Sequence, residues 1–337
     1  MELLPAHIPL PTFWDDEERT FLVGTSIEAA LEAKLKSLDR EFTLLRDSTL
    51  PINWCQQFWW DAETGALTFD DWKQVDAMYR SRALDLPGTG HVMVPYIDMA
   101  NHASGEDTVA LYETDDNGNA VLLLQHGKHT ILGEEITITY GDEKGACEML
   151  FSYGFIDDTM KSAQELFLDL EIPGDDPLKI AKMAVNNSAP GFRLFLQDDT
   201  IQWEGAFVWL LCVNEEDGLG FSVLQTNDGE RELSVNWKDS EITDISELDK
   251  LLKAELLWDV FELRAVATLQ TRLESQLRAL DSSEDRTQGI LSTDEAIYPR
   301  LFNALRLRGL ERTLMLRAYE TLENRVCFVR NFSSSSN

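Results

Sequence analysis

The spacing of apolar residues predicts a largely helical N-terminal region. Apolar side chains recur at the period of one helix face over about 26–46. These side chains are Ile27, Leu31, Leu35 and Leu38. Thr25 and Glu28 have the spacing of a capping box at the start of this stretch. The aromatic run 54–60 and the periodic stretch 69–84 extend the pattern, so we expect further helices there, with their aromatic side chains in the core.

From about residue 91 the pattern changes to short strand-like runs. Such runs, separated by turn residues, are typical of β-structure. They cover 92–97, 108–113, 120–125 and 135–140. Asn117 and Gly118 lie between the second and third runs and favour a hairpin, because both residues accept a positive φ. Residues 145–156 then predict a short helix that ends at a glycine.

Two long amphipathic helices are expected in the last third of the chain. The first covers about 246–280. The second has Ser292 and Glu295 in capping-box spacing at its start, and Pro299 inside it predicts a break or kink. Residues 205–237 mix strand-like segments with turn-rich sequence and favour no single state.

Length and composition indicate a globular protein. The chain has 337 residues, of which 44% are hydrophobic, and this length suggests about two domains. No stretch approaches the ~20 apolar residues of a membrane span, and the N-terminus lacks the basic and apolar parts of a signal peptide. We therefore expect an intracellular protein, in the cytoplasm and/or nucleus, without membrane contact.

The charge balance restricts the classes of partner. Asp and Glu number 60 against 29 Lys and Arg, which gives a net charge of −31. This charge would repel a phosphate backbone, so direct nucleic-acid binding is not expected. An acidic surface either attracts a basic protein or only maintains solubility. The 4 cysteines and 5 histidines show no metal-ligand spacing, so we expect no metal site.

Four short motifs carry the candidate chemistry. In chain order they are RSRAL at 80–84, VPYIDMANH at 94–102, GEEITITYG at 133–141 and LFSYGF at 150–155. Their order and spacing resemble the SET-domain protein lysine methyltransferases. Within these, the set is similar to the Rubisco large subunit methyltransferase-like group, whose members also act on ribosomal proteins and on an actin histidine. The resemblance extends over nearly the whole chain.

This resemblance implies a fold and a division of the chain. The fold class is α+β, with a partial SET-domain β core that carries a helical insertion, followed by a mainly α-helical C-terminal lobe. The implied parts are a helical insertion at 1–90, the C-terminal part of the SET core at 91–157, a mostly helical substrate-binding-like domain at 158–331 and a disordered tail at 332–337.

The resemblance also assigns a cofactor site. Asn101 and His102 would contact S-adenosylmethionine, largely through their backbone and the Asn101 side chain. Arg82 would pair with the cofactor's carboxylate, a role suited to its planar fork of donors, and Phe155 would stack near the cofactor. Tyr140 would be the catalytic residue and would also contact the cofactor, with its hydroxyl where the methyl group meets the substrate amine.

Three residues are assigned to the substrate side. Tyr153 would wall the lysine channel, and Asp98 and Tyr112 are further candidates. Without the resemblance, Arg82 is also compatible with a solvated helix charge and Tyr140 with a core tyrosine at a strand end.

One element of the family pattern is missing from the sequence. The strands with a G-x-G turn, which normally precede the helical insertion, have no counterpart here. Glycine in such a turn lets the backbone approach the cofactor closely. Three explanations stay open: a longer form of the protein carries the strands, the chain is a short relative without catalysis, or a partner completes the site.

The resemblance implies methyl transfer from S-adenosylmethionine to a lysine of a basic protein, such as a ribosomal protein or a histone. Histidine stays open as an alternative acceptor. The competing hypothesis is a truncated or degenerate SET protein without catalysis, which would act as a protein-binding module through the lobe after residue 160.

Overall fold

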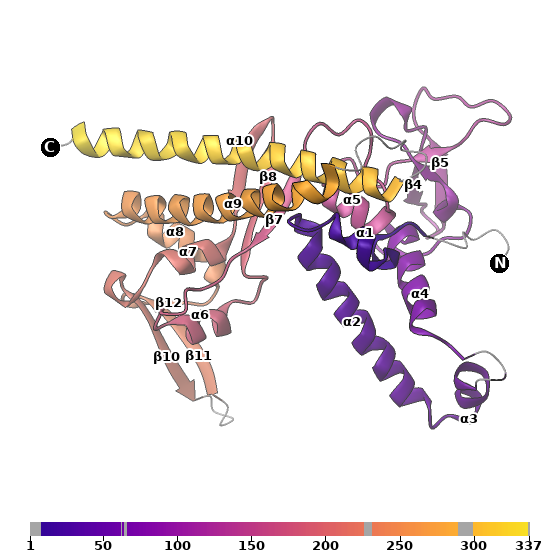
Figure 1. Cartoon of the computed structure of the whole chain (residues 1–337), viewed down its shortest axis with the longest axis horizontal. Helices are drawn as coiled ribbons and strands as arrows, with labels where there is room; N and C mark the ends of the chain where they lie inside the picture. The colour runs from indigo at the N-terminus through magenta and orange to yellow at the C-terminus, as the bar shows by residue number, and fades with distance from the viewer. Residues whose placement is uncertain (1–7, 62, 64–65, 226–230, 289–298, 336–337) are drawn as a thin grey trace. The chain divides into compact units, whose positions relative to one another are not determined.

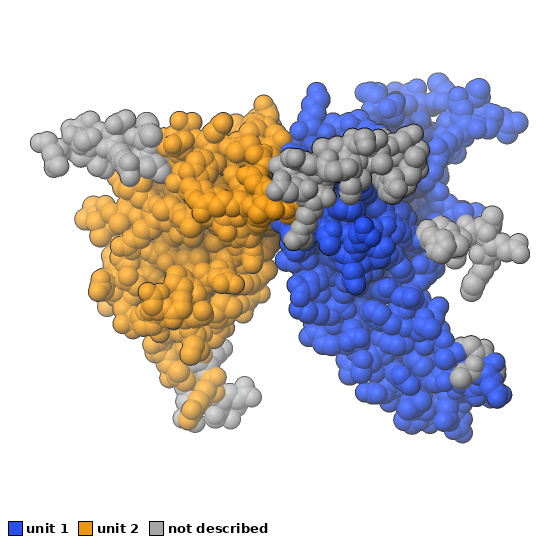
Figure 2. Space-filling model, viewed as in Figure 1, with its two compact units in different colours: residues 1–163, 286–310 blue, residues 164–285, 311–337 orange. Residues whose placement is uncertain are grey.

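The structure is a computed structural model (Figure 1). It describes residues 8–61, 63, 66–225, 231–288 and 299–335. The chain forms two compact units, which Figure 2 distinguishes by colour. The first unit contains residues 1–163 and 286–310, and the second contains residues 164–285 and 311–337. No helix among the described residues has the length and apolarity needed to cross a lipid bilayer.

The helices of the first unit follow the apolar period of the sequence. They are α1 (Asp16–Thr20), α2 (Ser26–Thr49), α3 (Asn53–Cys55), α4 (Phe69–Arg82) and α5 (Ala146–Tyr153), with a π-helical turn at Gln56–Trp60 and 3-10 turns at Pro11–Phe13, Ile97–Met99 and Gly105–Asp107. The predicted helix over 26–46 is α2, and Ile27, Leu31 and Leu38 are buried along it. Gly154 follows α5 in the left-handed conformation that glycine adopts easily, so the predicted end of this helix at a glycine is confirmed.

Two details of these helices differ from expectation. Thr25 is the N-cap of α2, but its hydroxyl donates to the Leu22 carbonyl at 2.6 Å, so the predicted capping box with Glu28 does not close. The aromatic run was expected in the core, yet Trp54 and Phe58 are exposed. Their rings pack on each other instead, with centroids 5.3 Å apart.

The strands of the first unit are short. They are β1 (Leu84–Leu86), β2 (Gly90–Val92), β3 (Asn101–His102), β4 (Ala110–Thr114), β5 (Ala120–Leu124) and β6 (Thr137–Ile138). The predicted hairpin is confirmed: β4 and β5 pair antiparallel around a turn in which Gly118 has a φ of +79°. The strand expected at 92–97 is wrong, because Pro95 lacks an N–H and Tyr96 takes a φ of +76°, so the chain turns there.

One parallel pairing in this unit connects two of the sequence motifs. β3 pairs with β6, with Asn101 opposite Thr137 and His102 opposite Ile138. Under this pair lies an apolar cluster of the buried residues Leu84, Ile97, Ala110 and Ile138, against which Tyr112 and Tyr140 pack. The pairing therefore brings the end of the 94–102 motif beside the end of the 133–141 motif.

The second unit combines helices with two three-stranded antiparallel sheets in its described residues. The sheets are β7 (Glu165–Asp169), β8 (Gly191–Gln197) and β9 (Thr200–Glu204), and β10 (Leu219–Gln225), β11 (Arg231–Trp237) and β12 (Ser240–Ile242). The helices are α6 (Lys179–Val185), α7 (Ala206–Cys212), α8 (Leu248–Lys253), α9 (Trp258–Gln288) and α10 (Pro299–Ser335), with 3-10 turns at Glu215–Asp217 and Ile245–Glu247. The end of α9 from Arg286 and the start of α10 up to Leu310 belong to the first unit. The α+β class is confirmed, and the lobe after residue 158 contains more β-structure than expected.

One of the two long C-terminal helices differs from the prediction. The first is divided into α8 and α9, where Glu255 accepts hydrogen bonds from the Trp237 indole at 3.0 Å and from Lys238. The second, α10, is described from Pro299 onward. Ser292, Glu295 and the residues directly before Pro299 lie outside the described residues, so the capping box and the break at Pro299 stay predictions.

The units divide the chain differently from the predicted parts. The division after residue 163 lies near the predicted boundary after 157, while the range assigned to the first unit also includes the start of α10 up to Leu310. Helix α10 extends to Ser335, so it takes in part of the tail predicted as disordered at 332–337, and residues 336–337 lie outside the described residues.

Candidate active site

A small cavity in the first unit collects residues from separate motifs. Its volume is about 30 Å³. Among its lining residues are Arg82, Asp98, Ala100, Ile138, Tyr140 and Tyr153. Arg82 lies at the end of α4, and Asp98 and Ala100 lie in the segment before β3. Ile138 ends β6, Tyr140 follows it, and Tyr153 lies at the end of α5. All four sequence motifs contribute to this region.

Tyr140 is held at the cavity by both ends of its side chain. Its hydroxyl donates a hydrogen bond to the Ala100 carbonyl at 2.9 Å. Its ring lies 4.6 Å from the Tyr153 ring and 5.2 Å from the His102 ring, measured between centroids. Tyr140 thus combines the packing of a core tyrosine with a place in the lining of the cavity.

The two tyrosines of the cavity are neutral phenols at ordinary pH. Burial raises the pKa of Tyr140, Tyr153 adds to the rise, and Arg82 opposes it. Burial also raises the pKa of Tyr153, where Lys144 opposes the rise. Both side chains therefore offer hydroxyl groups and ring faces rather than negative charge.

Arg82 is turned into the unit rather than into solvent. Its Nη1 donates to the Asp98 carbonyl at 3.1 Å and lies 3.6 Å from the Asp98 carboxylate. The side chains of Arg82 and Asp98 are 15% and 9% exposed, respectively, so the alternative of a solvated helix charge is excluded. Both contacts use Nη1. Within the described residues, Nε and Nη2 of the fork make no hydrogen bond, so the guanidinium can accept a further anionic partner.

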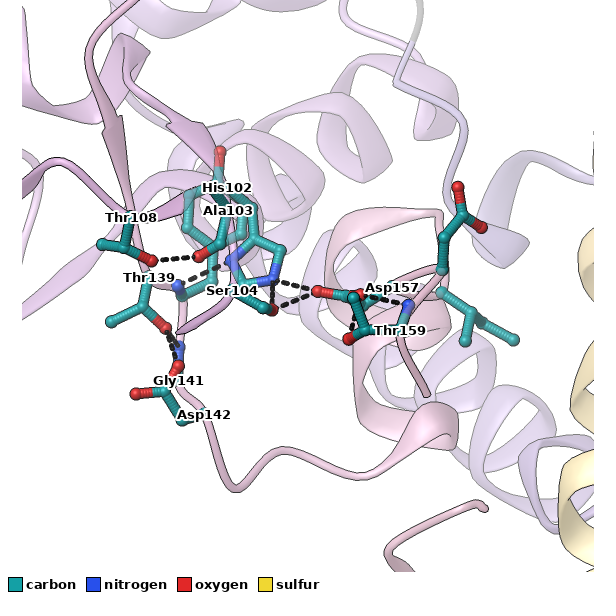
Figure 3. Close-up of polar contacts among 12 residues, drawn as sticks. His102, Ala103, Ser104, Thr108, Thr139, Gly141, Asp142, Asp157 and Thr159 are labelled. Atoms are coloured by element: carbon teal, nitrogen blue, oxygen red, sulfur yellow. Dashed lines mark hydrogen bonds and ion pairs between the residues drawn. The ribbon is translucent and has the colours of Figure 1, made fainter. Parts of the chain in front are cut away.

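Asn101 and His102 are neighbours on β3, and their side chains have different hydrogen-bond partners. Asn101 is exposed, and its amide donates a hydrogen bond to the Glu135 carboxylate. His102 is buried, with Nδ1 accepting the Tyr140 backbone N–H at 3.0 Å and Nε2 lying 3.0 Å from the Asp157 carboxylate (Figure 3). Both ring nitrogens of His102 thus have partners within the protein, so its backbone is the part that is available to a ligand.

The remaining predicted residues surround this centre. Phe155 lies 5.8 Å from the His102 ring and 6.4 Å from the Tyr140 ring. Tyr112 lies in β4 and packs against the same apolar cluster as Tyr140. Of the eight predicted site residues, four line the cavity, namely Arg82, Asp98, Tyr140 and Tyr153. The other four, Asn101, His102, Tyr112 and Phe155, belong to the same unit but are not part of the lining.

Several neighbours of the site were not predicted. Ser104 and Thr159 hold Asp157, which in turn faces His102 (Figure 3). Lys144 lies 5.8 Å from the centre of the Tyr153 ring and pairs with Glu148. Ser104 stands two positions after the predicted His102, and a polar residue following a motif histidine is the signal that could have drawn attention to it.

The donor set fits a ligand that carries a carboxylate and a positive centre. Arg82 supplies part of a guanidinium fork for a carboxylate. The rings of Tyr140, Tyr153 and Phe155 offer faces to a cation. S-adenosylmethionine has both features, so the residues present fit the cofactor that the sequence resemblance implies.

Comparison with known proteins shows which proteins the chain resembles. No protein-family model matches the chain. The chain is 29% identical over 288 residues to SET domain-containing protein 8 of Schizosaccharomyces pombe, covering 82% of this chain and 63% of that protein. It is 26% identical over 194 residues to the [fructose-bisphosphate aldolase]-lysine N-methyltransferase, chloroplastic, of Arabidopsis thaliana, covering 56% of this chain and 39% of that protein. The chain thus spans less than two thirds of the length of either relative.

Solved structures agree with the sequence relatives. The SET domain of LSMT bound to MeLysine and AdoHcy matches with a TM-score of 0.65 at 20% identity, covering 97% of this chain and 70% of that chain. Rubisco LSMT bound to AdoMet matches equally well, with a TM-score of 0.65 at 19% identity. The chain has the SET-domain fold, and its homologues are SET-domain proteins. Among them are the methyltransferases of the Rubisco LSMT-like group, so the resemblance read from the four motifs is confirmed.

Proposed function

We propose that this protein is a SET-type methyltransferase that transfers a methyl group from S-adenosylmethionine to a lysine side chain of a protein. The observation that carries the proposal is the meeting of Arg82, the Tyr140 hydroxyl and the Tyr153 ring at one cavity. One sequence relative is named as a lysine N-methyltransferase, and another is named as an N-methyltransferase of the Rubisco large subunit. Structural neighbours hold AdoMet, AdoHcy or sinefungin, and some also hold lysine or methyllysine.

The proposal gives each cavity residue a task. Arg82 would bind the cofactor's carboxylate, and the Asn101–His102 segment would hold its adenine and amino-acid parts. When bound, S-adenosylmethionine supplies an electrophilic methyl group on a sulfonium. Tyr140 would direct its hydroxyl toward the place where the substrate amine approaches, and Phe155 and Tyr153 would supply ring faces around it.

The aromatic surroundings favour the reactive form of the substrate. A lysine amine has a reference pKa of about 10.4, so keeping it neutral at pH 7 costs roughly 4.6 kcal/mol. Desolvation lowers the pKa of an amine. Because burial raises the pKa of Tyr140 and of Tyr153, both phenols stay uncharged and do not stabilise the ammonium form as a phenolate would.

The finer proposal concerns the substrate and its location. A net charge of −31 favours a basic protein, such as a ribosomal protein or a histone. The relatives are named for fructose-bisphosphate aldolase and for the Rubisco large subunit, so these proteins are the first comparison substrates. An intracellular location is supported by the free thiols of Cys55 and Cys212, which are buried in the described part of the chain.

Two measurements test the function. Isothermal titration calorimetry with S-adenosylmethionine should give a dissociation constant below about 1 mM. Transfer of labelled methyl groups to histones, ribosomal proteins, aldolase and Rubisco, followed by mass spectrometry of the product, should locate the label on lysine. Label on histidine would revise the acceptor. Absence of binding at millimolar cofactor would overturn the proposal for this chain and favour a non-catalytic, protein-binding role.

A further inference from the structure

We infer that Asp157 is a positioning residue for Tyr140 and that it acts through the imidazole of His102. The inference rests on the proposed function, in which Tyr140 lies at the site of methyl transfer. Asp157 lies outside the four sequence motifs and does not line the cavity. Its effect on Tyr140 is therefore indirect.

The three residues form a continuous chain of contacts. The Asp157 carboxylate lies 3.0 Å from Nε2 of His102, and Nδ1 of His102 accepts the backbone N–H of Tyr140 at 3.0 Å (Figure 3). The side chains of His102 and Asp157 are 6% and 11% exposed, so solvent does not easily replace either contact.

The geometry determines which imidazole nitrogen carries the proton. A neutral imidazole has one donor nitrogen and one acceptor nitrogen. A backbone amide can only donate, so Nδ1 of His102 must be the acceptor that receives the Tyr140 N–H. The proton therefore resides on Nε2, where it faces the Asp157 carboxylate and the Ser104 hydroxyl oxygen, each at 3.0 Å. The carboxylate holds the Ser104 hydroxyl as a donor to itself. Without the carboxylate, this hydroxyl could donate to Nε2 instead, so the other tautomer would become accessible, and its Nδ1–H would oppose the Tyr140 N–H.

Asp157 is itself held in place at both carboxylate oxygens. Oδ1 accepts the backbone N–H and the hydroxyl of Thr159, each at 2.7 Å. Oδ2 accepts the hydroxyl of Ser104 and faces His102. Burial alone would raise the pKa of Asp157, but the hydrogen bonds from Ser104, Thr159 and His102 outweigh it and hold that pKa below its usual range. The carboxylate thus remains an acceptor throughout the neutral range.

Tyr140 needs such an anchor because little else fixes its backbone. The strand before it, β6, has only the residues Thr137–Ile138 paired with β3. The residue after it, Gly141, has a φ of +132°, a conformation that glycine adopts easily. The His102 side chain therefore supplies a hydrogen bond to the Tyr140 backbone beyond the last paired residue of the strand.

A double-mutant cycle separates this role from a merely structural one. Asp157→Leu should lower kcat by at least about tenfold and leave the dissociation constant of S-adenosylmethionine within about twofold. An asparagine at position 102 can present its amide oxygen near the place of Nδ1 but cannot reach Asp157. In the His102→Asn background, Asp157→Leu should therefore lower kcat by less than about twofold further. An equal loss in both backgrounds would overturn the inference.

Two further variants keep the test informative if Asp157→Leu folds poorly. Asp157→Asn retains an oxygen that can accept the Nε2–H, so it should retain more activity than Asp157→Leu. A glutamine at position 102 can reach Asp157 but offers no acceptor to Tyr140, so His102→Gln should lose more kcat than His102→Asn. The reverse order of the two His102 variants would contradict the inference.

A readout without activity separates this inference from the proposed function. Nitrogen-15 NMR of the imidazole should show Nε2 of His102 protonated and Nδ1 unprotonated in the wild-type protein, and a changed tautomer balance in Asp157→Asn or Asp157→Leu. Protonated Nδ1 in the wild type would overturn the inference whether or not the protein transfers methyl groups. Absence of cofactor binding with the expected tautomer would instead overturn the proposed function alone.

Discussion

The Tyr140 hydroxyl and the Ala100 carbonyl form a 2.9 Å hydrogen bond although the two residues are 40 positions apart. The parallel pairing of β3 with β6 explains this contact, because it places Asn101 opposite Thr137 and so brings Ala100 close to the residues after β6. Two motifs that are separate in the sequence thereby form one wall of the cavity.

Tyr140→Phe should lower methyl transfer by about 10²-fold, because a hydroxyl that orients the reacting groups is lost. The hydrogen bond to Ala100 contributes about 0.5–1.5 kcal/mol, so the stability loss should stay in that range. Single-turnover kinetics and urea denaturation measure the two effects. Tyr79→Phe, at an exposed tyrosine of α4 outside the cavity lining, is the control and should retain most of the transfer rate. Similar losses in both variants would contradict the special role of Tyr140.

Arg82→Met should weaken S-adenosylmethionine binding by more than about tenfold, which corresponds to about 1.4 kcal/mol. It should also destabilise the fold by about 1–3 kcal/mol, because Asp98 loses the donor to its carbonyl and the cation beside its carboxylate. Calorimetry and urea denaturation measure these quantities separately.

The double variant Arg82→Met with Asp98→Asn distinguishes the two roles of this arginine. Removing the unpaired carboxylate should restore part of the lost stability, since a buried charge without its partner is the costly state. Cofactor binding should stay weak, because the guanidinium is still absent. Recovery of binding together with stability would show that Arg82 acts on the fold and not on the ligand.

Much of the site could be predicted because its chemistry lies in short motifs whose local structure is simple. The Asn117–Gly118 pair predicted the β4–β5 hairpin, and the glycine after Tyr153 predicted the end of α5. These signals depend on backbone preferences of neighbouring residues, which a sequence displays directly.

The parts that could not be predicted depend on contacts between distant residues. Asp157 meets His102 across 55 positions, and no periodicity marks a polar residue in a loop. The division between α8 and α9 coincides with the bond from Trp237 to Glu255, a tertiary contact without local signal. The described residues of 205–237 include α7 and two strands of one sheet, and the register of these strands is defined by their pairing.

Gly154→Ala should destabilise the protein by about 2–4 kcal/mol, from the cost of a left-handed residue and from overpacking. Gly154 has a φ of +83°, and an added Cβ would lie 2.8 Å from Cγ of Pro9 and 2.9 Å from its carbonyl oxygen. Gly118→Ala is the matched control, with a φ of +79° and no atom within 4 Å of an added Cβ, and should cost only about 1 kcal/mol. Equal losses of unfolding free energy in the two variants, measured by urea denaturation, would show that Pro9 moves aside without an energetic cost.

The stability contributed by Asp157 should depend on pH in a defined direction. Its pKa is lower in the folded protein than the ordinary aspartate value of about 3.9. A depressed carboxyl pKa stabilises the fold above the ordinary value, and that contribution is lost as the pH falls from there toward the folded value. Asp157→Asn should therefore be less stable than the wild type by about 1–3 kcal/mol at pH 7, and the difference should shrink between about pH 4 and pH 3. Urea denaturation at pH 7, 5, 4 and 3 measures this trend, with Asp47→Asn on the exposed face of α2 expected to change stability by less than about 0.5 kcal/mol. A difference that stays constant or grows toward low pH would contradict the ionised state assigned to Asp157.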